Sequence, residues 1–235
     1  MHLLAATAGI ISDGSEAADL GQTPGEIVFL SAADTELAAL AAAQGRAGKN
    51  APTLRLANFL QLKHPMSVDV YVENVIRYAK LVVVRMLGGA SYWSYGIEQI
   101  AATCQQNGIG FAAVPGDDTP DLDLAQRGTL PSDAIHRLWQ YLVNGGPANA
   151  DNFLHYAAFL IGREVDWAEP APLMTAGLYW PDTDVLDLDV LQGFWKKNAP
   201  IVAITFYRAL IQSGNTEPID AIIAAIQKRG LNPLP

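Results

Sequence analysis

Residues that could do chemistry gather in the stretch from Arg55 to Trp93. His64 lies in a polar loop before a helix start, and an imidazole that titrates near neutral pH could carry a proton or contact a metal ion. A hydrogen bond that only orders the loop is the alternative role for His64. Arg85 follows the apolar run Leu81–Val84, where its guanidinium could hold a ligand carboxylate or pair with one of the chain's acidic residues.

A glycine pair and two aromatic residues come next along the chain. Gly88 and Gly89 allow either a close approach of the backbone to a ligand or a tight turn. Tyr92 and Trp93 could form a flat aromatic wall, or they could belong to the core at a helix entrance. Because polar, glycine and aromatic residues meet where strands end and helices begin, the pattern predicts a ligand site at the carboxyl edge of a sheet.

A second pair of candidates, Tyr207 and Arg208, follows a later apolar run, and the same two alternatives apply to it. His64 is the candidate for catalysis or metal contact. The candidates for substrate binding are Arg85, Gly88, Gly89, Tyr92, Trp93, Tyr207 and Arg208.

The sequence lacks the motifs of several other chemistries. It contains no G-x-x-x-x-G-K-[ST], the Gly88-Gly89 pair is not a dinucleotide fingerprint, and no two histidines have the spacing of a helical zinc motif. There is no G-x-S-x-G nucleophile elbow. The single cysteine, Cys104, excludes an internal disulfide and fits a reducing compartment such as the cytoplasm. We therefore expect no nucleotide or metal cofactor bound in this chain.

Composition narrows the class of protein further. The formal net charge of −9 and the pI near 4.8 argue against a nucleic-acid surface, which needs a basic stripe. Half of the 235 residues are hydrophobic, enough for a sizeable core. No apolar run approaches the roughly 20 residues of a membrane span.

Apolar runs alternate with amphipathic segments, which is typical of an α/β protein. The pattern predicts a Rossmann-like or flavodoxin-like layered sheet with flanking helices, plus the start of a second α/β unit. The predicted strands of the first unit are Met1–Ala8, Glu26–Ala33, Leu54–Phe59, Leu81–Val84 and Ile109–Val114. We divide the chain into an α/β domain at 1–163 with a helical extension, a connector at 164–175, and a truncated second unit at 176–235.

Caps and periodicity place the predicted helices. Asp34 or Thr35, Ser67 and Ser132 are expected N-caps, because their side-chain oxygens can accept an amide hydrogen of the first turn. The helix after Asp34 is expected to turn Leu37, Leu40 and Ala41 inward and to stop at Gly45. Four further helices are predicted. The first follows Ser67, the second carries Ile97–Cys104 and ends at Gly108, the third follows Ser132, and the fourth spans about 149–161. The stretch Pro115–Gly128 is expected to be an acidic loop.

The second unit is predicted to begin with a short strand at Leu178–Trp180 and an acidic loop or short helix at Thr183–Asp189. A buried strand at Ile201–Phe206, a helix and a strand from Leu231 follow, with Pro233 and Pro235 weakening the last one. The helix repeats the apolar spacing of the helix before Gly108, as Ile219, Ile222, Ile223 and Ile226. This repeated spacing is explained either by the usual pattern of strand–helix–strand units or by a duplication. The last strand has barely started at Pro235, so we expect a longer protein.

Seven ordered segments carry a family resemblance. They are SAADTELAAL at Ser31–Leu40, LRLANFLQLKHPMSVDVYVE at Leu54–Glu73, VVVRMLGGASYWSYG at Val82–Gly96, VPGDD at Val114–Asp118, YLVNGGPANADNFLHYAA at Tyr141–Ala158, GLYWP at Gly177–Pro181 and FYRALIQSGNTEPIDAII at Phe206–Ile223. With these segments the chain resembles the N-terminal part of the large subunit of aerobic cobalt chelatase. That subunit is similar to the porphyrin-binding large subunit of magnesium chelatase.

The resemblance implies an enzyme complex that inserts Co²⁺, as a substrate, into the corrin-type tetrapyrrole hydrogenobyrinic acid a,c-diamide during aerobic cobalamin synthesis. It also implies separate AAA+ partner subunits that bind ATP and Mg²⁺, which agrees with the missing P-loop. Insertion requires desolvation of the ion and removal of two pyrrole protons, for which bases and a macrocycle-sized apolar pocket are suited. Family large subunits are several times longer, so the resemblance implies that this chain alone is inactive. A magnesium chelatase-type subunit and a non-catalytic docking module for the AAA+ partners are the alternatives.

Overall fold

The computed structural model describes residues 16–48, 50–183 and 187–235. The chain forms two compact units, divided between Ala171 and Pro172. The predicted strand Met1–Ala8 lies outside the described residues.

The first unit is built on a parallel sheet of β1 (Ile27–Ser31), β2 (Leu54–Asn58), β3 (Leu81–Met86) and β4 (Gly110–Pro115). The strand order is β2-β1-β3-β4, with Ile27 beside both Leu54 and Leu81. The chain therefore passes from β1 outward to β2, crosses back over β1, and continues outward through β3 to β4. This doubly wound order confirms the predicted α/β class.

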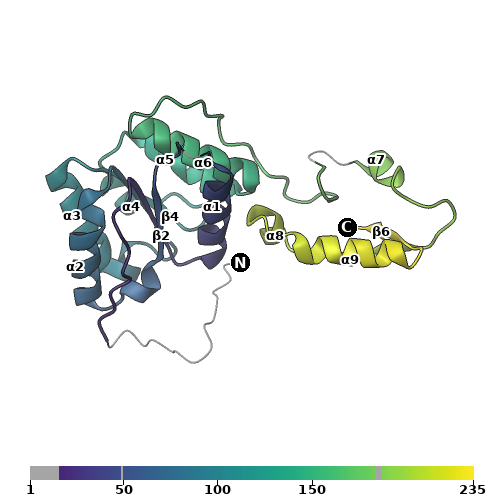
Figure 1. The fold of residues 1–235 in the computed structure, drawn as a ribbon, viewed down its shortest axis with the longest axis horizontal. Helices are drawn as coiled ribbons and strands as arrows, with labels where there is room; N and C mark the ends of the chain where they lie inside the picture. Colours follow the sequence, from purple (N-terminus) through teal and green to yellow (C-terminus); the bar gives the residue numbers. More distant parts are fainter. Residues whose placement is uncertain (1–15, 49, 184–186) are drawn as a thin grey trace. The chain divides into compact units, whose positions relative to one another are not determined.

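Helices cover both faces of this sheet, so its strands are apolar on both sides. α2 (Pro65–Asn74) and α3 (Ser94–Asn107) lie on one face, and α1 (Asp34–Arg46), α5 (Ser132–Asn144) and α6 (Pro147–Leu160) lie on the other (Figure 1). Successive strand residues alternate between the two cores. The α2–α3 core contains Val28, Leu30, Val82, Val84, Phe111 and Ala113. The α1–α5–α6 core contains Ile27, Phe29, Leu81, Val83, Ala112 and Val114.

Helix ends differ from the sequence prediction at three caps. α2 begins earlier than predicted because Pro65 occupies the first turn, where a proline loses nothing by lacking an N–H. His64 is its N-cap, and Ser67 is a buried helical residue whose Oγ accepts from the backbone N of Ala18 at 2.8 Å. α5 is preceded by Pro131 as N-cap, so the predicted cap at Ser132 is wrong.

α1 also departs from its predicted pattern. Its N-cap is Ala33, without a side-chain cap bond, so the predicted cap at Asp34 or Thr35 is wrong. Leu40 is buried as expected, but Ala41 is exposed. Gly45 does not stop the helix, which continues to Arg46.

The connections contain short helices that the sequence pattern did not reveal. Single 3₁₀ turns cover Phe59–Leu62, Ile76–Tyr78 and Ala90–Trp93. The stretch 115–128 is not only a loop, because it contains α4 (Leu122–Gln126). Asp121 caps α4 by accepting from the backbone N of Leu124 at 3.1 Å, and five residues are too few to show a helical period in the sequence.

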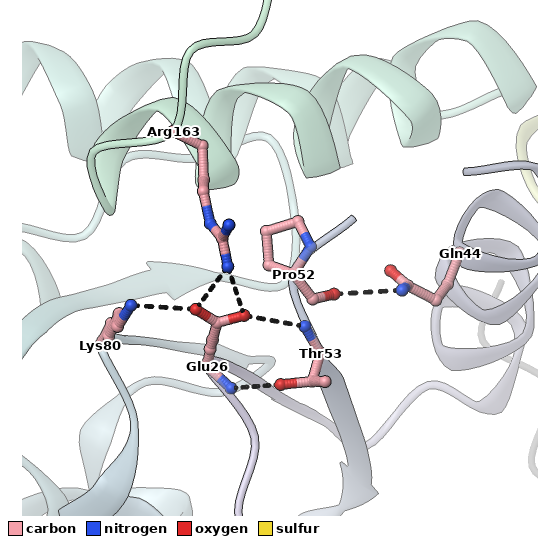
Figure 2. A network of polar contacts seen from close by, with 6 residues as sticks. All are labelled: Glu26, Gln44, Pro52, Thr53, Lys80 and Arg163. Carbon is pink, nitrogen blue, oxygen red and sulfur yellow. Dashed lines mark hydrogen bonds and ion pairs between the residues drawn. The ribbon is translucent and has the colours of Figure 1, made fainter. Parts of the chain in front are cut away.

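The amino ends of the central strands are tied by Glu26 (Figure 2). Its Oε1 pairs with Lys80 Nζ at 2.9 Å and with Arg163 Nη2 at 2.9 Å. Its Oε2 accepts from Thr53 N at 3.3 Å, and its own backbone N donates to Thr53 Oγ1 at 2.9 Å. One carboxylate therefore joins the starts of β1, β2 and β3 to the end of α6, at the edge of the sheet opposite the predicted site.

The segment after α6 has no regular secondary structure but is fixed to the first unit. Asn149 Nδ2 donates to Ala171 O at 2.8 Å, and Asn149 Oδ1 accepts from Ala171 N at 3.0 Å. Ala168 N donates to Asn152 Oδ1 at 2.8 Å, and the hydroxyl of Tyr141 donates to Ala168 O. Backbone groups that lack a helix or sheet partner are thus satisfied by side chains.

The second unit contains a two-stranded parallel sheet of β5 (Ile201–Ala203) and β6 (Asn232–Leu234). Its helices are α7 (Leu188–Gln192), α8 (Ala209–Gln212) and α9 (Glu217–Lys228), and its small core includes Trp180, Leu191, Ile219 and Ile223.

Two strand predictions in the second unit are wrong. Residues 178–180 form no strand, although Tyr179 N donates to Pro235 O at 3.3 Å. The strand predicted as buried to Phe206 stops at Ala203, and the Ile201 residue is 55% exposed. Residues 184–186, within the predicted acidic loop, lie outside the described residues, and Asp187 then caps α7.

Candidate functional site

A cavity of about 370 Å³ opens at the carboxyl ends of β1 and β3. These two strands are neighbours, but the chain leaves β1 toward α1 on one face and leaves β3 toward α3 on the other. Such a switch point creates the crevice in which open α/β sheets bind ligands. The cavity is lined by Ser31, Ala32, Ala33, Glu36, Leu60, Arg85, Leu87, Gly88, Tyr92 and Gly116.

Arg85 is the central polar residue of this cavity. It lies within β3 and on the same face as Val83, so it reaches toward α1 and α5. Its Nη1 lies 2.7 Å from Glu36 Oε1 and donates to Leu142 O at 2.9 Å. Its Nη2 donates to Gly116 O at 2.9 Å. Of the two roles that the sequence left open, pairing with an acidic residue is therefore present in the structure.

Electrostatics at Arg85 reflect its burial. Only 6% of the residue is exposed, and removal from water lowers the pKa of the guanidinium. The negative charges of Glu36 and Asp117 oppose that shift in pKa. An arginine guanidinium keeps its proton in proteins, so Arg85 carries its positive charge at neutral pH. The cavity therefore contains a buried ion pair whose charges largely cancel.

Glycine geometry shapes the other side of the cavity. Gly88 and Gly89 have φ values of +93° and +73°, a region that residues with a Cβ rarely adopt. The turn they form carries the chain into the 3₁₀ segment that contains Tyr92 and Trp93. A Cβ at Gly89 would meet Asp121 Oδ2 at 3.3 Å. The glycine pair thus makes a tight turn, and Gly88 also lines the cavity.

The two aromatic candidates are placed differently. Tyr92 lines the cavity with 58% of its surface exposed. Trp93 is buried, stacks on Phe59 with ring centroids 5.0 Å apart, and donates from Nε1 to Leu62 O at 2.9 Å. Tyr92 can therefore offer a surface to a ligand, whereas Trp93 has the core position that was the alternative.

His64 is not among the residues that line this cavity. Its Nδ1 accepts from the backbone N of Met66 at 3.2 Å and so caps α2. The loop-ordering hydrogen bond considered for this residue is present. The described residues contain no group of three or more His, Cys, Asp or Glu side chains placed to hold a metal ion.

Tyr207 and Arg208 belong to the second unit. Tyr207 is 70% exposed. Arg208 precedes α8 and donates from Nη1 to Leu173 O at 3.2 Å. Within the first unit, the structure thus brings together Arg85, Gly88 and Tyr92 around one cavity, and His64 and Trp93 do not line it.

Sequence reasoning missed the residues that β1 and α1 contribute. Ser31 ends β1, and its Oγ donates to Glu36 Oε2 at 2.7 Å while accepting from Ala33 N at 3.0 Å. Glu36 then pairs with Arg85. The available signal in the sequence was a serine at a strand end followed by an acidic residue in the next helix. This signal could not be connected to Arg85 without knowing that β1 lies beside β3.

Comparison with known proteins shows which family the chain resembles. It is 47% identical to the aerobic cobaltochelatase subunit CobN of Sinorhizobium sp over 244 aligned residues, which cover 100% of this chain and 19% of the relative. A profile described as CobN/Magnesium Chelatase matches residues 139–235. The chain is similar to the CobN/magnesium chelatase family.

Two further relatives agree with this family. The aerobic cobaltochelatase subunit CobN of Pseudomonas aeruginosa is 39% identical over 236 residues, again 100% of this chain and 19% of the relative. The structure of the catalytic subunit of cobaltochelatase from Mycobacterium tuberculosis matches with a TM-score of 0.66 and 27% identity, covering 89% of this chain and 16% of that one. The chain thus spans about a fifth of the length of the CobN relatives.

No described helix of the chain is long and apolar enough to cross a membrane.

Proposed function

We propose that this chain is a region of the large subunit of an ATP-dependent cobalt chelatase of the cytoplasm, which inserts Co²⁺ into hydrogenobyrinic acid a,c-diamide in aerobic cobalamin synthesis. The observation that carries the proposal is the 47% identity with a cobaltochelatase subunit across the whole chain. ATP and Mg²⁺ belong to AAA+ partner subunits in this proposal.

The part that this region plays is proposed to be binding and architecture rather than proton transfer. The polar candidates already have structural partners in the chain: Arg85 binds Glu36 and the carbonyl oxygens of Leu142 and Gly116, and His64 caps α2. Tyr92 and Leu87 instead expose apolar surface beside the cavity. A cavity of about 370 Å³ is near the lower limit of ligand pockets, which span roughly 300–1,000 Å³. It suits a small molecule or one side arm better than an entire macrocycle.

A domain-exchange experiment tests the proposed function. The matching region of the Sinorhizobium subunit is replaced by this chain, and the chimera is combined with its AAA+ partners, ATP, Co²⁺ and the diamide. We expect cobalt insertion, followed by the absorbance change of the corrin and by metal analysis of the isolated product. Insertion of magnesium into a porphyrin, with no insertion of cobalt into the diamide, would overturn the choice of substrate.

Variants of the same chimera test the candidate residues. We expect Tyr92→Ala to raise the KM for the tetrapyrrole while kcat is kept, because only ground-state binding surface is removed. Arg208→Ala tests the candidate in the second unit. Unchanged kinetics would mean that Arg208 has only the structural role of its contact with Leu173. If the chimera binds the AAA+ partners but does not bind the tetrapyrrole, that result would instead favour the alternative that this region is a non-catalytic docking module.

A further inference from the structure

The cavity between β1 and β3 combines apolar walls with one buried ion pair. The apolar lining consists of Ala32, Ala33, Leu60, Leu87 and the ring of Tyr92. Glu36 and Arg85 supply opposite charges 2.7 Å apart. The site is therefore mostly apolar, with a few polar groups that could fix the orientation of a ligand.

The donors of Arg85 are not all used. A guanidinium carries five N–H donors. Nε donates to Pro115 O at 3.3 Å, Nη1 donates to Leu142 O and forms the ion pair with Glu36, and Nη2 donates to Gly116 O. Among the residues that the structure describes, no acceptor is assigned to the second hydrogen of Nη2. This donor belongs to a side chain that is only 6% exposed, so leaving it unmatched is costly.

Charge selects the kind of ligand group that fits. A ligand carboxylate could use the Arg85 donor but would meet the negative charge of Glu36, and Asp117 also acts on Arg85. A ligand ammonium could meet Glu36 but would face the guanidinium. An uncharged group with an acceptor beside a donor can use the Arg85 donor, is not repelled by Glu36, and brings no net charge into an apolar space.

We propose that this cavity binds a primary carboxamide carried on a small apolar body. The amide oxygen accepts from Arg85 Nη2, and the amide N–H faces the carboxylate of Glu36. The apolar body lies against Leu60, Leu87 and Tyr92. The volume of about 370 Å³ accommodates such a molecule. Nothing in this assignment depends on the proposed cobalt insertion.

Three probes of similar shape and different charge test the proposal on the 235-residue chain. Benzamide, benzoate and benzylamine are titrated against the protein, and their dissociation constants are measured by ligand-observed NMR. We expect benzamide to bind at least about tenfold more tightly than either charged probe, the factor expected for one unmatched buried hydrogen bond. Equal binding of benzoate and benzamide contradicts the proposal.

Two variants connect that selectivity to the cavity. Ala32→Phe fills the space and should weaken benzamide by about tenfold or more, whereas Ala42→Phe, on an exposed position of α1, should leave it unchanged. Glu36→Gln removes the negative charge beside Arg85, so the preference should reverse toward benzoate. Unchanged benzamide affinity in Ala32→Phe overturns the site even if Glu36→Gln does not fold.

A competition experiment separates two sources of the carboxamide. Displacement of benzamide by hydrogenobyrinic acid a,c-diamide assigns the cavity to an amide side arm of that larger molecule. Binding of benzamide that the diamide does not displace assigns it to a separate small amide. Only this arm rests on the proposed function, so a failure of cobalt insertion and a failure of carboxamide binding are observed independently.

Discussion

Replacement of Gly96 by alanine is expected to destabilise the first unit, although alanine is the better helix former. Gly96 lies in the first turn of α3, and a Cβ built there would overlap the indole of Trp93. That indole cannot move freely, because it is buried, stacked on Phe59 at an interplanar angle of 15° and hydrogen-bonded to Leu62 O. The extra methyl group therefore strains a packed core.

The expected magnitude follows from three opposing contributions. Overpacking costs about 1–3 kcal/mol. Loss of the Trp93 hydrogen bond costs about 1 kcal/mol more. The higher helix propensity of alanine returns up to about 1 kcal/mol. We expect Gly96→Ala to lower the free energy of unfolding by about 2 kcal/mol, the balance of these contributions.

Gly45→Ala is the matched control, because it makes the same substitution in a helix without the clash. Gly45 lies near the end of α1, and a Cβ there would meet no heavy atom within 4 Å. We expect it to raise the free energy of unfolding by about 0.5 kcal/mol, part of the full propensity difference.

Urea unfolding followed by circular dichroism measures the change in stability. Hydrogen exchange of β3 amides reports the first unit alone, since circular dichroism sums both units. An increase in stability of similar size in both variants would refute the argument, because helix propensity would then outweigh the Trp93 contact.

Three further predictions concern other parts of the chain. Glu26 has a pKa below its ordinary 4.5, chiefly because Lys80 donates a hydrogen bond to its carboxylate. The ionised carboxylate therefore stabilises the fold fully above about pH 4.5, and this contribution is lost as the pH falls through the lowered pKa of the folded chain. Glu26→Gln should therefore lower the free energy of unfolding by up to about 1 kcal/mol at neutral pH and reduce its dependence on pH on the acid side. The control Glu73→Gln, which removes an exposed ion pair with Arg77, should change little. Equal pH profiles of stability for the two variants would contradict this prediction. Burial raises the pKa of the Cys104 thiol to about 12, so iodoacetamide at about pH 8 should label it only after unfolding, and labelling of the native chain at the unfolded rate would show that it is accessible. Asn149→Ala should cost about 1–3 kcal/mol and speed proteolysis in the segment 163–171, because two hydrogen bonds to Ala171 are lost; unchanged cleavage would mean that other contacts hold the segment.

The architecture of the first unit was predictable because its signals are local. The run Leu81–Val84 is apolar at every position, as expected for a strand covered on both faces, and it is β3. Gly108 adopts φ +67° and ends α3, as the sequence indicated. Helix starts were less predictable, since a proline at 65 moved the start of α2 ahead of the more obvious cap at Ser67.

The second unit shows where a repeated pattern misleads. Ile100 and Ile222 occupy equivalent places in the two similar helices, but Ile100 is buried and Ile222 is 44% exposed. The first helix packs on a four-stranded sheet, whereas β5 and β6 form a sheet of two strands. Apolar spacing therefore predicts which face of a helix is suited to burial, and the size of the sheet determines how much of that face is covered.

Only the residues that β3 and its following loop contribute to the candidate site were predictable, and the reason lies in the order of the strands. Arg85, Gly88 and Tyr92 follow one strand directly, so their position at a sheet edge could be inferred from local sequence. Glu36 follows a different strand, and it reaches Arg85 only because β1 pairs with β3 as well as with β2. The order of strands is a property of long-range pairing, which no local pattern in one sequence contains.

The ion pair between Arg85 and Glu36 determines which experiments on this site are informative. Arg85 holds three backbone carbonyls and one carboxylate, so its removal leaves a buried charge and several unmatched acceptors. Breaking such a pair is expected to cost about 3–5 kcal/mol, and lost activity in an Arg85 variant would not separate folding from function. Ala32 and Tyr92 line the same cavity without taking part in that network. Changes at these two positions can therefore alter ligand binding while the fold remains intact.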